Sequence, residues 1–139
     1  MSFFGAQFTP SGGTAILLGG ITDASPDSDA AGVHIKGDLD VFARVIATPT
    51  HTRTITITCQ DVAKAGTIPT GVAGTLVISL GDSVNKGVAL GGGLLYTYTG
   101  AVCTKNNSKG GHGATADGSL TFECQAPDGQ TDPLIVTTL

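Results

Sequence analysis

Apolar and polar residues alternate strictly near the end of the chain, in the segment 119–125. Leu120, Phe122 and Cys124 occupy every second position, and polar residues stand between them. A period of two is typical of a strand with one packed face and one solvated face. An Asp-Gly dipeptide on each side favours tight turns, because both residue types tolerate positive φ. The pattern predicts a strand bounded by turns.

The same alternation recurs along the chain. In 53–60, Ile55, Ile57 and Cys59 alternate with threonines. Further apolar runs bounded by Gly, Asp or Pro predict strands at 15–21, 38–48, 75–80, 94–104 and 134–139. Because turn residues recur about every 8–12 positions, the predicted fold is all-β, an antiparallel β-sandwich or partly open barrel of about 7–8 strands.

Helix is predicted to be scarce. Only 61–65, ahead of Gly66, and 83–90 have room for a short helix, and at most one is expected. Ten of the eleven acidic residues are Asp, and Glu123 is the single Glu. Asp favours turns whereas Glu favours helices, so this bias also argues against a helical fold.

Some segments lack a strand pattern within what is predicted to be a single domain over 1–139. Residues 1–14 are expected to form an irregular N-terminal arm, which holds three of the five Phe residues. Exposed Phe is unfavourable, so this arm is expected to dock on its own body or on a neighbour. Residues 22–37 are expected to form a long polar loop, and loops of that length usually serve a function. Another loop is expected at 105–113.

Composition narrows the choice of partners. Charged residues make up 13% of the chain, 21 residues are Gly and none is Trp, which predicts an aliphatic core. The net charge of −4 argues against a protein that grips nucleic acid, since that needs a basic face. A surface past which nucleic acid slides remains compatible with this charge.

The three cysteines, Cys59, Cys103 and Cys124, are an odd number without C-x-x-C spacing. Cys59 and Cys124, which follow apolar residues on one strand face, are interpreted as small buried hydrophobes, with a disulfide as the alternative that requires oxidising surroundings. Residues 1–6 show neither a basic region nor an apolar run, so no signal peptide is expected. No apolar stretch approaches membrane-spanning length, and synthesis in a cytoplasm with reduced thiols is expected.

One string imitates an enzyme. The run 78–85, with Gly81, Asp82 and Ser83, resembles the first block of the GDS-type lipases and esterases. That chemistry needs a histidine from a D-x-x-H motif, and no histidine here has Asp three residues before it. A plain turn is the interpretation preferred, and no enzyme activity or catalytic residue is predicted.

Ligand sites are not predicted either. The Asp groups at 23–29 and 128–132 offer oxygen ligands but lack the ordered spacing of a calcium loop. The three histidines are isolated, and 105–113 lacks the order of a phosphate-binding loop. No metal and no cofactor are expected.

The segment 119–133 is a predicted strand that ends in Ala-Pro-Asp-Gly and is followed by Asp-Pro. Together with the strand-rich 54–59 and 75–80 and the long 22–37 segment, it resembles the tail tube (major tail) proteins of tailed bacteriophages and related tube-forming virion proteins. The resemblance spans most of the chain.

This resemblance implies a structural subunit that assembles with itself into stacked rings, with six subunits in a ring. The inner strands would complete a β-barrel, and DNA would pass through the tube without specific binding. The implied location is the virion tail, with other tail proteins as partners and no membrane. Six copies of a −4 subunit would give the channel an acidic character.

The resemblance also implies positions for contacts. Candidates for contacts between subunits lie in the arm, the long loop and the C-terminal tail: Phe3, Phe4, Phe8, Asp27, Asp29, Leu134 and Leu139. Candidates for the lumen are acidic residues on outward-alternating strand positions: Asp40, Asp117 and Glu123. The alternative function is a small β-sandwich binding module for capsid decoration or carbohydrate, although only Tyr96 and Tyr98 could serve as a ligand-stacking surface.

Overall fold

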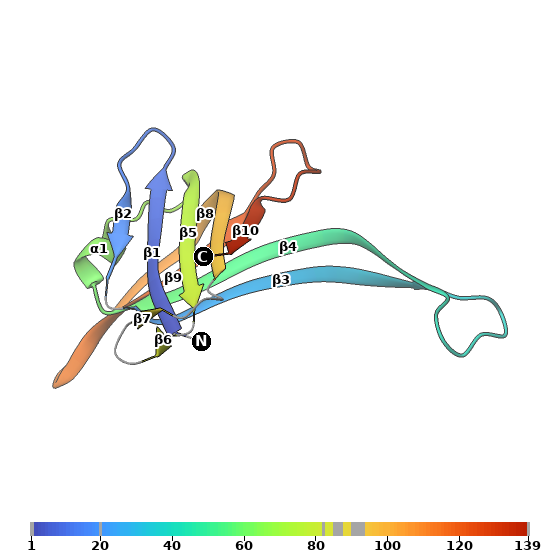
Figure 1. The fold of residues 1–139 in the computed structure, drawn as a ribbon, viewed down its shortest axis with the longest axis horizontal. Helices are drawn as coiled ribbons and strands as arrows, with labels where there is room; N and C mark the ends of the chain where they lie inside the picture. The colour runs from blue at the N-terminus through green and yellow to red at the C-terminus, as the bar shows by residue number, and fades with distance from the viewer. Residues whose placement is uncertain (1, 20, 82, 85–87, 90–93, 139) are drawn as a thin grey trace.

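The computed structural model describes residues 2–19, 21–81, 83–84, 88–89 and 94–138. It is nearly all antiparallel β-sheet with one short helix, and the sheet is not closed, which confirms the predicted fold class (Figure 1). The elements are β1 Ser2–Pro10, β2 Ile16–Leu18, β3 Ile21–Ile35, β4 Val45–Cys59, α1 Val62–Gly66, β5 Ala73–Gly81, β6 Ser83–Val84, β7 Val88–Ala89, β8 Leu94–Gly111, β9 Ala114–Cys124 and β10 Leu134–Thr138. No helix among the described residues is long and apolar enough to cross a membrane.

Strand β8 joins two layers. Its first part, 94–98, pairs with β5 and β10, whereas from Ala101 onward it pairs with β9. The strand order β2-β1-β5-β8-β9-β4-β3 therefore divides at β8 into sheet I (β2, β1, β5, the start of β8, and β10) and sheet II (the rest of β8, β9, β4 and β3). Gly100 lies at the switch, where the Gln125 backbone N–H donates to its carbonyl over 2.9 Å.

The core lies between the two sheets, as the period-two pattern predicts. The rings of Phe8 and Phe122 lie 5.1 Å apart, and Leu120, Ile55 and Ile57 are fully buried beside them. These side chains come from alternate positions on their strands, because successive strand residues point to opposite faces.

Helix α1 closes one end of the core and lies at one of the two places where the sequence left room for a short helix. The Asp61 carboxylate caps it by accepting a hydrogen bond from the Lys64 backbone N–H over 3.2 Å. The Asn106 side-chain amide holds the other end, donating to the carbonyls of Ala65 at 2.9 Å and Ile68 at 3.1 Å.

Two expectations about irregular segments are wrong. Most of the expected arm is strand β1, which lies between β2 and β5 and buries Phe8 completely. The expected loop at 22–37 is mostly strand β3, paired with β4 along its length. The polar residues of β3 misled the prediction because it is an edge strand, where Asp and Pro are tolerated on solvated positions.

Two boundaries were also wrong. Strand structure begins at Val45 rather than at Asp38, and Asp40 lies in the turn between β3 and β4. The expected loop at 105–113 is strand up to Gly111, because pairing with β9 extends β8 through a segment of low local strand propensity.

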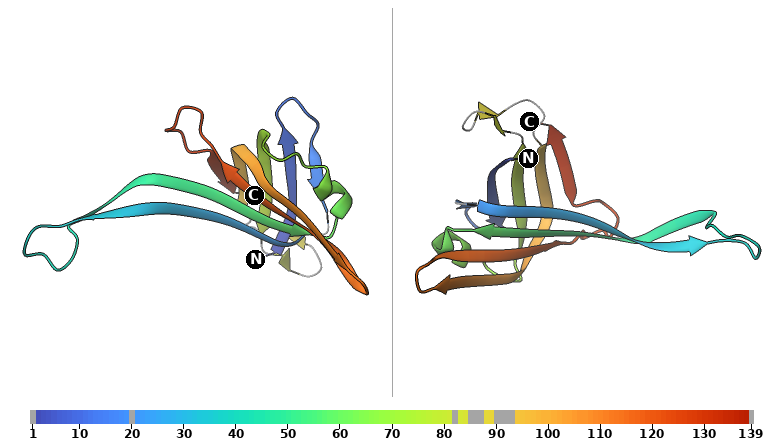
Figure 2. Two further views of the ribbon diagram at one scale, coloured as in Figure 1. Left: turned by 180° about the vertical axis from the view of Figure 1, so that it is seen from behind. Right: turned by 90° about the horizontal axis from the view of Figure 1, so that it is seen from below.

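Both long hairpins extend beyond the two-layered body. The β3–β4 hairpin reaches far to one side, and the β8–β9 hairpin extends to the other (Figures 1 and 2). Because β9 pairs with β4 only over Thr54–Cys59, the part of the first hairpin at 28–53 is a two-stranded ribbon.

Candidate assembly surfaces

Sheet II has one face that packs on the core and one that carries only polar side chains over most of its area. Residues directly opposite each other in neighbouring strands share a face, so the register defines it. Asp27 lies opposite Thr54, and Thr54 lies opposite Glu123. We call this surface the polar face; it comprises Asp23, Ser25, Asp27 and Asp29 of β3, Thr52, Thr54, Thr56 and Thr58 of β4, Asp117, Ser119, Thr121 and Glu123 of β9, and Lys105, Asn107 and Lys109 of β8.

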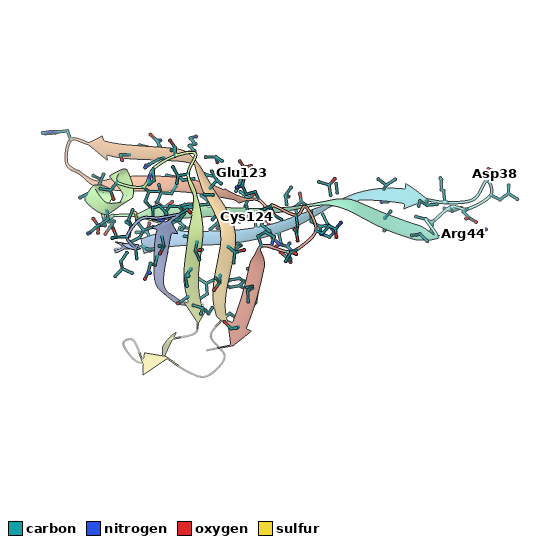
Figure 3. All side chains as sticks on the ribbon, turned by 90° about the horizontal axis from the view of Figure 1, so that it is seen from above. Asp38, Arg44, Glu123 and Cys124 are labelled. Carbon is teal, nitrogen blue, oxygen red and sulfur yellow. The ribbon has the colours of Figure 1, made fainter. Side chains whose placement is uncertain are left out.

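The polar face is acidic. Five carboxylates and two ammonium groups give it a formal charge of −3. The expected lumen residues Asp117 and Glu123 lie on it, and Figure 3 shows Glu123 on β9 beside the half-buried Cys124. The register adds Asp27 and Asp29, which the sequence had suggested as contacts between subunits.

Asp40 lies elsewhere. Its carboxylate accepts hydrogen bonds from the Arg44 guanidinium and from the Gly37 backbone N–H at 2.7 Å, in the turn that ends the ribbon. The hydrogen bond from Arg44 lowers the pKa of Asp40. Asp38 and Arg44 mark this turn in Figure 3, far from β9. Asp40 therefore lies in a turn and not on a strand, where the sequence had placed it as a lumen candidate.

The other contact candidates are dispersed. Phe8 is in the core, so the folded chain cannot present it to a partner. The backbones of Phe3 and Phe4 belong to β1, but their side chains are outside the described set. Leu134 packs partly buried against the core from β10. Leu139 lies outside the described residues.

Both edges of sheet II are open within the described part of the chain. On one side, β3 pairs only with β4. On the other, β8 pairs with β5 only up to Val102, so from 104 to 111 its single strand partner is β9. An open edge presents unpaired backbone N–H and C=O groups to any strand that approaches it.

The end of the ribbon exposes large apolar side chains around the Asp40–Arg44 ion pair, and we call it the apolar end. In the turn, Leu39 is 96% exposed, Val41 84% and Phe42 85%. Four more large apolar residues on the adjoining strands are at least half exposed: Val33, Ile35, Val45 and Ile46. Large apolar groups are costly to leave in water, so this end has the character of a contact surface.

An ion pair ties the base of the ribbon to the 125–133 loop. Arg53 donates two hydrogen bonds to the Asp132 carboxylate, at 2.8 and 3.2 Å. This contact lowers the pKa of Asp132 and raises that of Arg53. A surface pocket of about 330 Å³ lies along the same loop, between Thr99 and Pro133. Within its lining, the Thr131 hydroxyl donates a hydrogen bond to the Asp128 carboxylate.

Within the described residues, the candidate chemical groups of the sequence do not gather into one site. The three cysteines are free thiols, and burial raises the pKa of Cys124 to about 11 and raises those of Cys59 and Cys103. Ser83 belongs to β6, and its neighbour Asp82 lies outside the described residues. Among the described residues, no three His, Cys, Asp or Glu side chains gather as a metal site.

Sequence reasoning missed three features of these surfaces: Asp23, the lysines of β8, and the apolar end of the ribbon. The alternation Asp23, Ser25, Asp27, Asp29 was a usable signal for an edge strand with one polar face. The run Lys105, Asn106, Asn107 gave no comparable signal, because it is polar at every position and shows no alternation. Only the structure shows that the Asn106 side chain contacts α1.

The structure is similar to that of the anti-feeding prophage cap, described as a tube terminating cap and determined by cryo-electron microscopy. The TM-score is 0.57 at 13% sequence identity, and the similarity covers 96% of this chain and 88% of that chain. At this identity the likeness concerns the fold. No protein-family model matches the sequence, and neither does any curated protein.

Proposed function

We propose that this chain is a structural, non-enzymatic subunit of a phage-tail-related particle, and that it assembles with itself into stacked rings that form a tube. One observation carries the proposal: a four-stranded sheet with two open edges and one polar face. The similarity to a tube terminating cap supports a tail-related role, with other tail proteins as partners in the virion.

The strand directions of sheet II are compatible with ring closure. Its four strands are antiparallel neighbours in the order β8, β9, β4, β3, so β3 runs opposite to β8. A copy related by rotation about a ring axis therefore brings its β8 edge antiparallel to the β3 edge of its neighbour. Repetition of this joint closes the sheets into a barrel that has no open edge. A ring of six copies, as in the tail tube proteins that the sequence resembles, is the size we propose.

The polar face would line the lumen of such a barrel, because the opposite face of sheet II is occupied by the core. Its net charge of −3 per copy repels the phosphates of DNA. Its hydroxyl and carboxylate groups offer DNA no stacking surface, and the five carboxylates outnumber the two lysines. The tube would conduct DNA without holding it.

The apolar end of the ribbon would make the contact between rings. Its seven large apolar residues are all at least half exposed, and Val33, Ile35 and Val45 share one face of the ribbon. Large apolar side chains that gather on an exposed surface are typical of interaction sites. A two-stranded ribbon is also marginally stable on its own in water, so burial against a second copy would stabilise it.

Negative-stain electron microscopy and mass photometry test this function. The purified chain is imaged over a wide range of protein concentration, at low and at physiological salt. We expect rings with a hollow centre and, at high concentration, stacks of rings. Monodisperse monomers under every condition would refute the proposal.

A further inference from the structure

We propose that the joint between ring subunits is set by ion pairs across the two open edges of sheet II, with Lys105 and Lys109 of one copy facing Asp27 and Asp23 of a second copy. This inference rests on the proposed ring assembly and names the contact that determines its register.

The β3 edge is acidic. Asp23, Asp27 and Asp29 are exposed, lie on the polar face, and share strand β3 with no Lys or Arg. In the part of the chain that the structure describes, no salt bridge involves them. The Asp29 carboxylate accepts a hydrogen bond from the Ala30 backbone N–H. Asp23 and Asp27 belong to the outermost strand of sheet II, next to its open edge.

The β8 edge is basic. Lys105 and Lys109 are exposed and are the two cationic residues of β8. The Asn106 side chain is held on the opposite face by the carbonyls of Ala65 and Ile68, so Lys105 is directed to the polar face. Lys109 lies opposite Asp117 on β9, which offsets part of its charge, whereas Lys105 lies opposite the uncharged Thr121.

The spacing of the charges matches. Lys105 and Lys109 are four residues apart on a stretch of β8 with unbroken register, and so are Asp23 and Asp27 on β3. In an antiparallel joint, Lys105 opposite Asp27 therefore places Lys109 opposite Asp23. Between them Asn107 faces Ser25, which adds a neutral polar pair.

The joint also keeps the polar residues of both strands on the same face of the joined sheet. Within one copy, Lys105 lies level with Ser25 across the sheet, through Thr121 and Thr56. The proposed pairing shifts the neighbouring copy by two residues along the strand, in keeping with the stagger between strands that barrels require. An even shift keeps both polar faces in the lumen, whereas a shift of one residue would turn the acidic face toward the core side.

Charge reversal with complementation tests the joint. The variant K105E/K109E makes both edges acidic, and D23K/D27K makes both basic. Each variant alone is expected to need at least roughly tenfold more protein for half-assembly than the wild type, because like charges meet at every joint. An equimolar mixture of the two variants restores opposite charges at every joint. It is expected to form rings that alternate the two chains and contain an even number of subunits.

K36E/K64E is the matched control, since it changes the net charge equally at two exposed lysines outside sheet II. It is expected to form rings at the wild-type concentration, and circular dichroism of each variant checks that the exposed substitutions leave the fold intact. Rings formed by both reversed variants at the wild-type concentration, or no rescue in the mixture, would overturn this inference while the ring function stands. A wild-type chain that never forms rings would instead overturn the proposed function itself.

Discussion

Arg53 on β4 and Asp132 in the loop before β10 form a two-pronged contact between elements 79 residues apart in sequence. The contact fixes the 125–133 loop to the place where the ribbon leaves the body. It thereby links sheet I, through β10, to sheet II, through β4, outside the apolar core.

This ion pair predicts a pH dependence of stability. The pKa of Asp132 is lowered in the folded chain, so its carboxylate stabilises the fold above the ordinary Asp pKa of 3.8, and the contribution is lost as pH falls through the lowered value. Because the Asp132 side chain is half exposed, solvent screening limits the contribution to about 0.5–1 kcal/mol. Thermal melts of the wild type and Asp132→Asn from pH 7 to pH 2 should converge at low pH. Parallel curves at all pH values would contradict the prediction.

Because the rings of Phe8 and Phe122 pack on each other in the core, truncating one of them should greatly lower the stability of the fold. Phe122→Ala should destabilise the fold by about 3–5 kcal/mol, since the ring is fully buried and packs on Phe8. Denaturant unfolding measures the change. Thr121→Ala, next in sequence but on the polar face, is the control and should stay within about 0.5 kcal/mol.

We expect that only glycine is tolerated at position 100, where β8 passes from sheet I to sheet II. A Cβ added there would lie 2.0 Å from the Gln125 carbonyl oxygen, a backbone atom that cannot move without breaking the turn into the 125–133 loop. Gly100→Ala should destabilise the fold by more than about 3 kcal/mol or prevent soluble expression. Gly66→Ala is the matched control and should express and melt like the wild type, since a Cβ there meets no atom within 4 Å outside its own helix and chain neighbours.

Polar substitutions at the apolar end of the ribbon should reduce the stacking of rings without changing the stability of the fold. In the variant V41S/F42S, two highly exposed side chains become polar, so the melting temperature of the monomer should be unchanged. Stacking of rings should be reduced or lost, as scored by the length of stacks in electron micrographs. Leu17→Ser on β2 alters another exposed apolar residue and should leave stacking intact. Equal stack lengths in all three proteins would contradict the role of the ribbon.

Burial of the three cysteines should make their thiols unreactive in the folded chain. Cys59 and Cys103 are fully buried, and burial raises the pKa of the half-buried Cys124 to about 11, so little reactive thiolate forms at neutral pH. A thiol reagent should label the native protein more than tenfold more slowly than the guanidinium-unfolded protein. Three thiols should then be counted after unfolding without reductant, and fewer would indicate a disulfide.

The alternation at 53–60 and 119–125 predicted strands whose inward faces the structure confirms, because a strand with one buried face is specified by its own side chains. The arm, the 22–37 loop and the 105–113 loop were mispredicted for a common reason. Glycine, proline and polar residues have low strand propensity, but backbone pairing with β5, β4 and β9 overrides that preference.

The sequence by itself determined the all-β class and the buried set around Phe122, since these follow from local period and residue type, whereas it left two places open for a short helix. Only the tertiary structure decided that Asp23, Asp27 and Glu123 share one face while Lys105 lies at the opposite edge. Register between strands that are distant in sequence depends on which backbone groups pair. The pattern within one strand does not indicate which strand it pairs with or in what register.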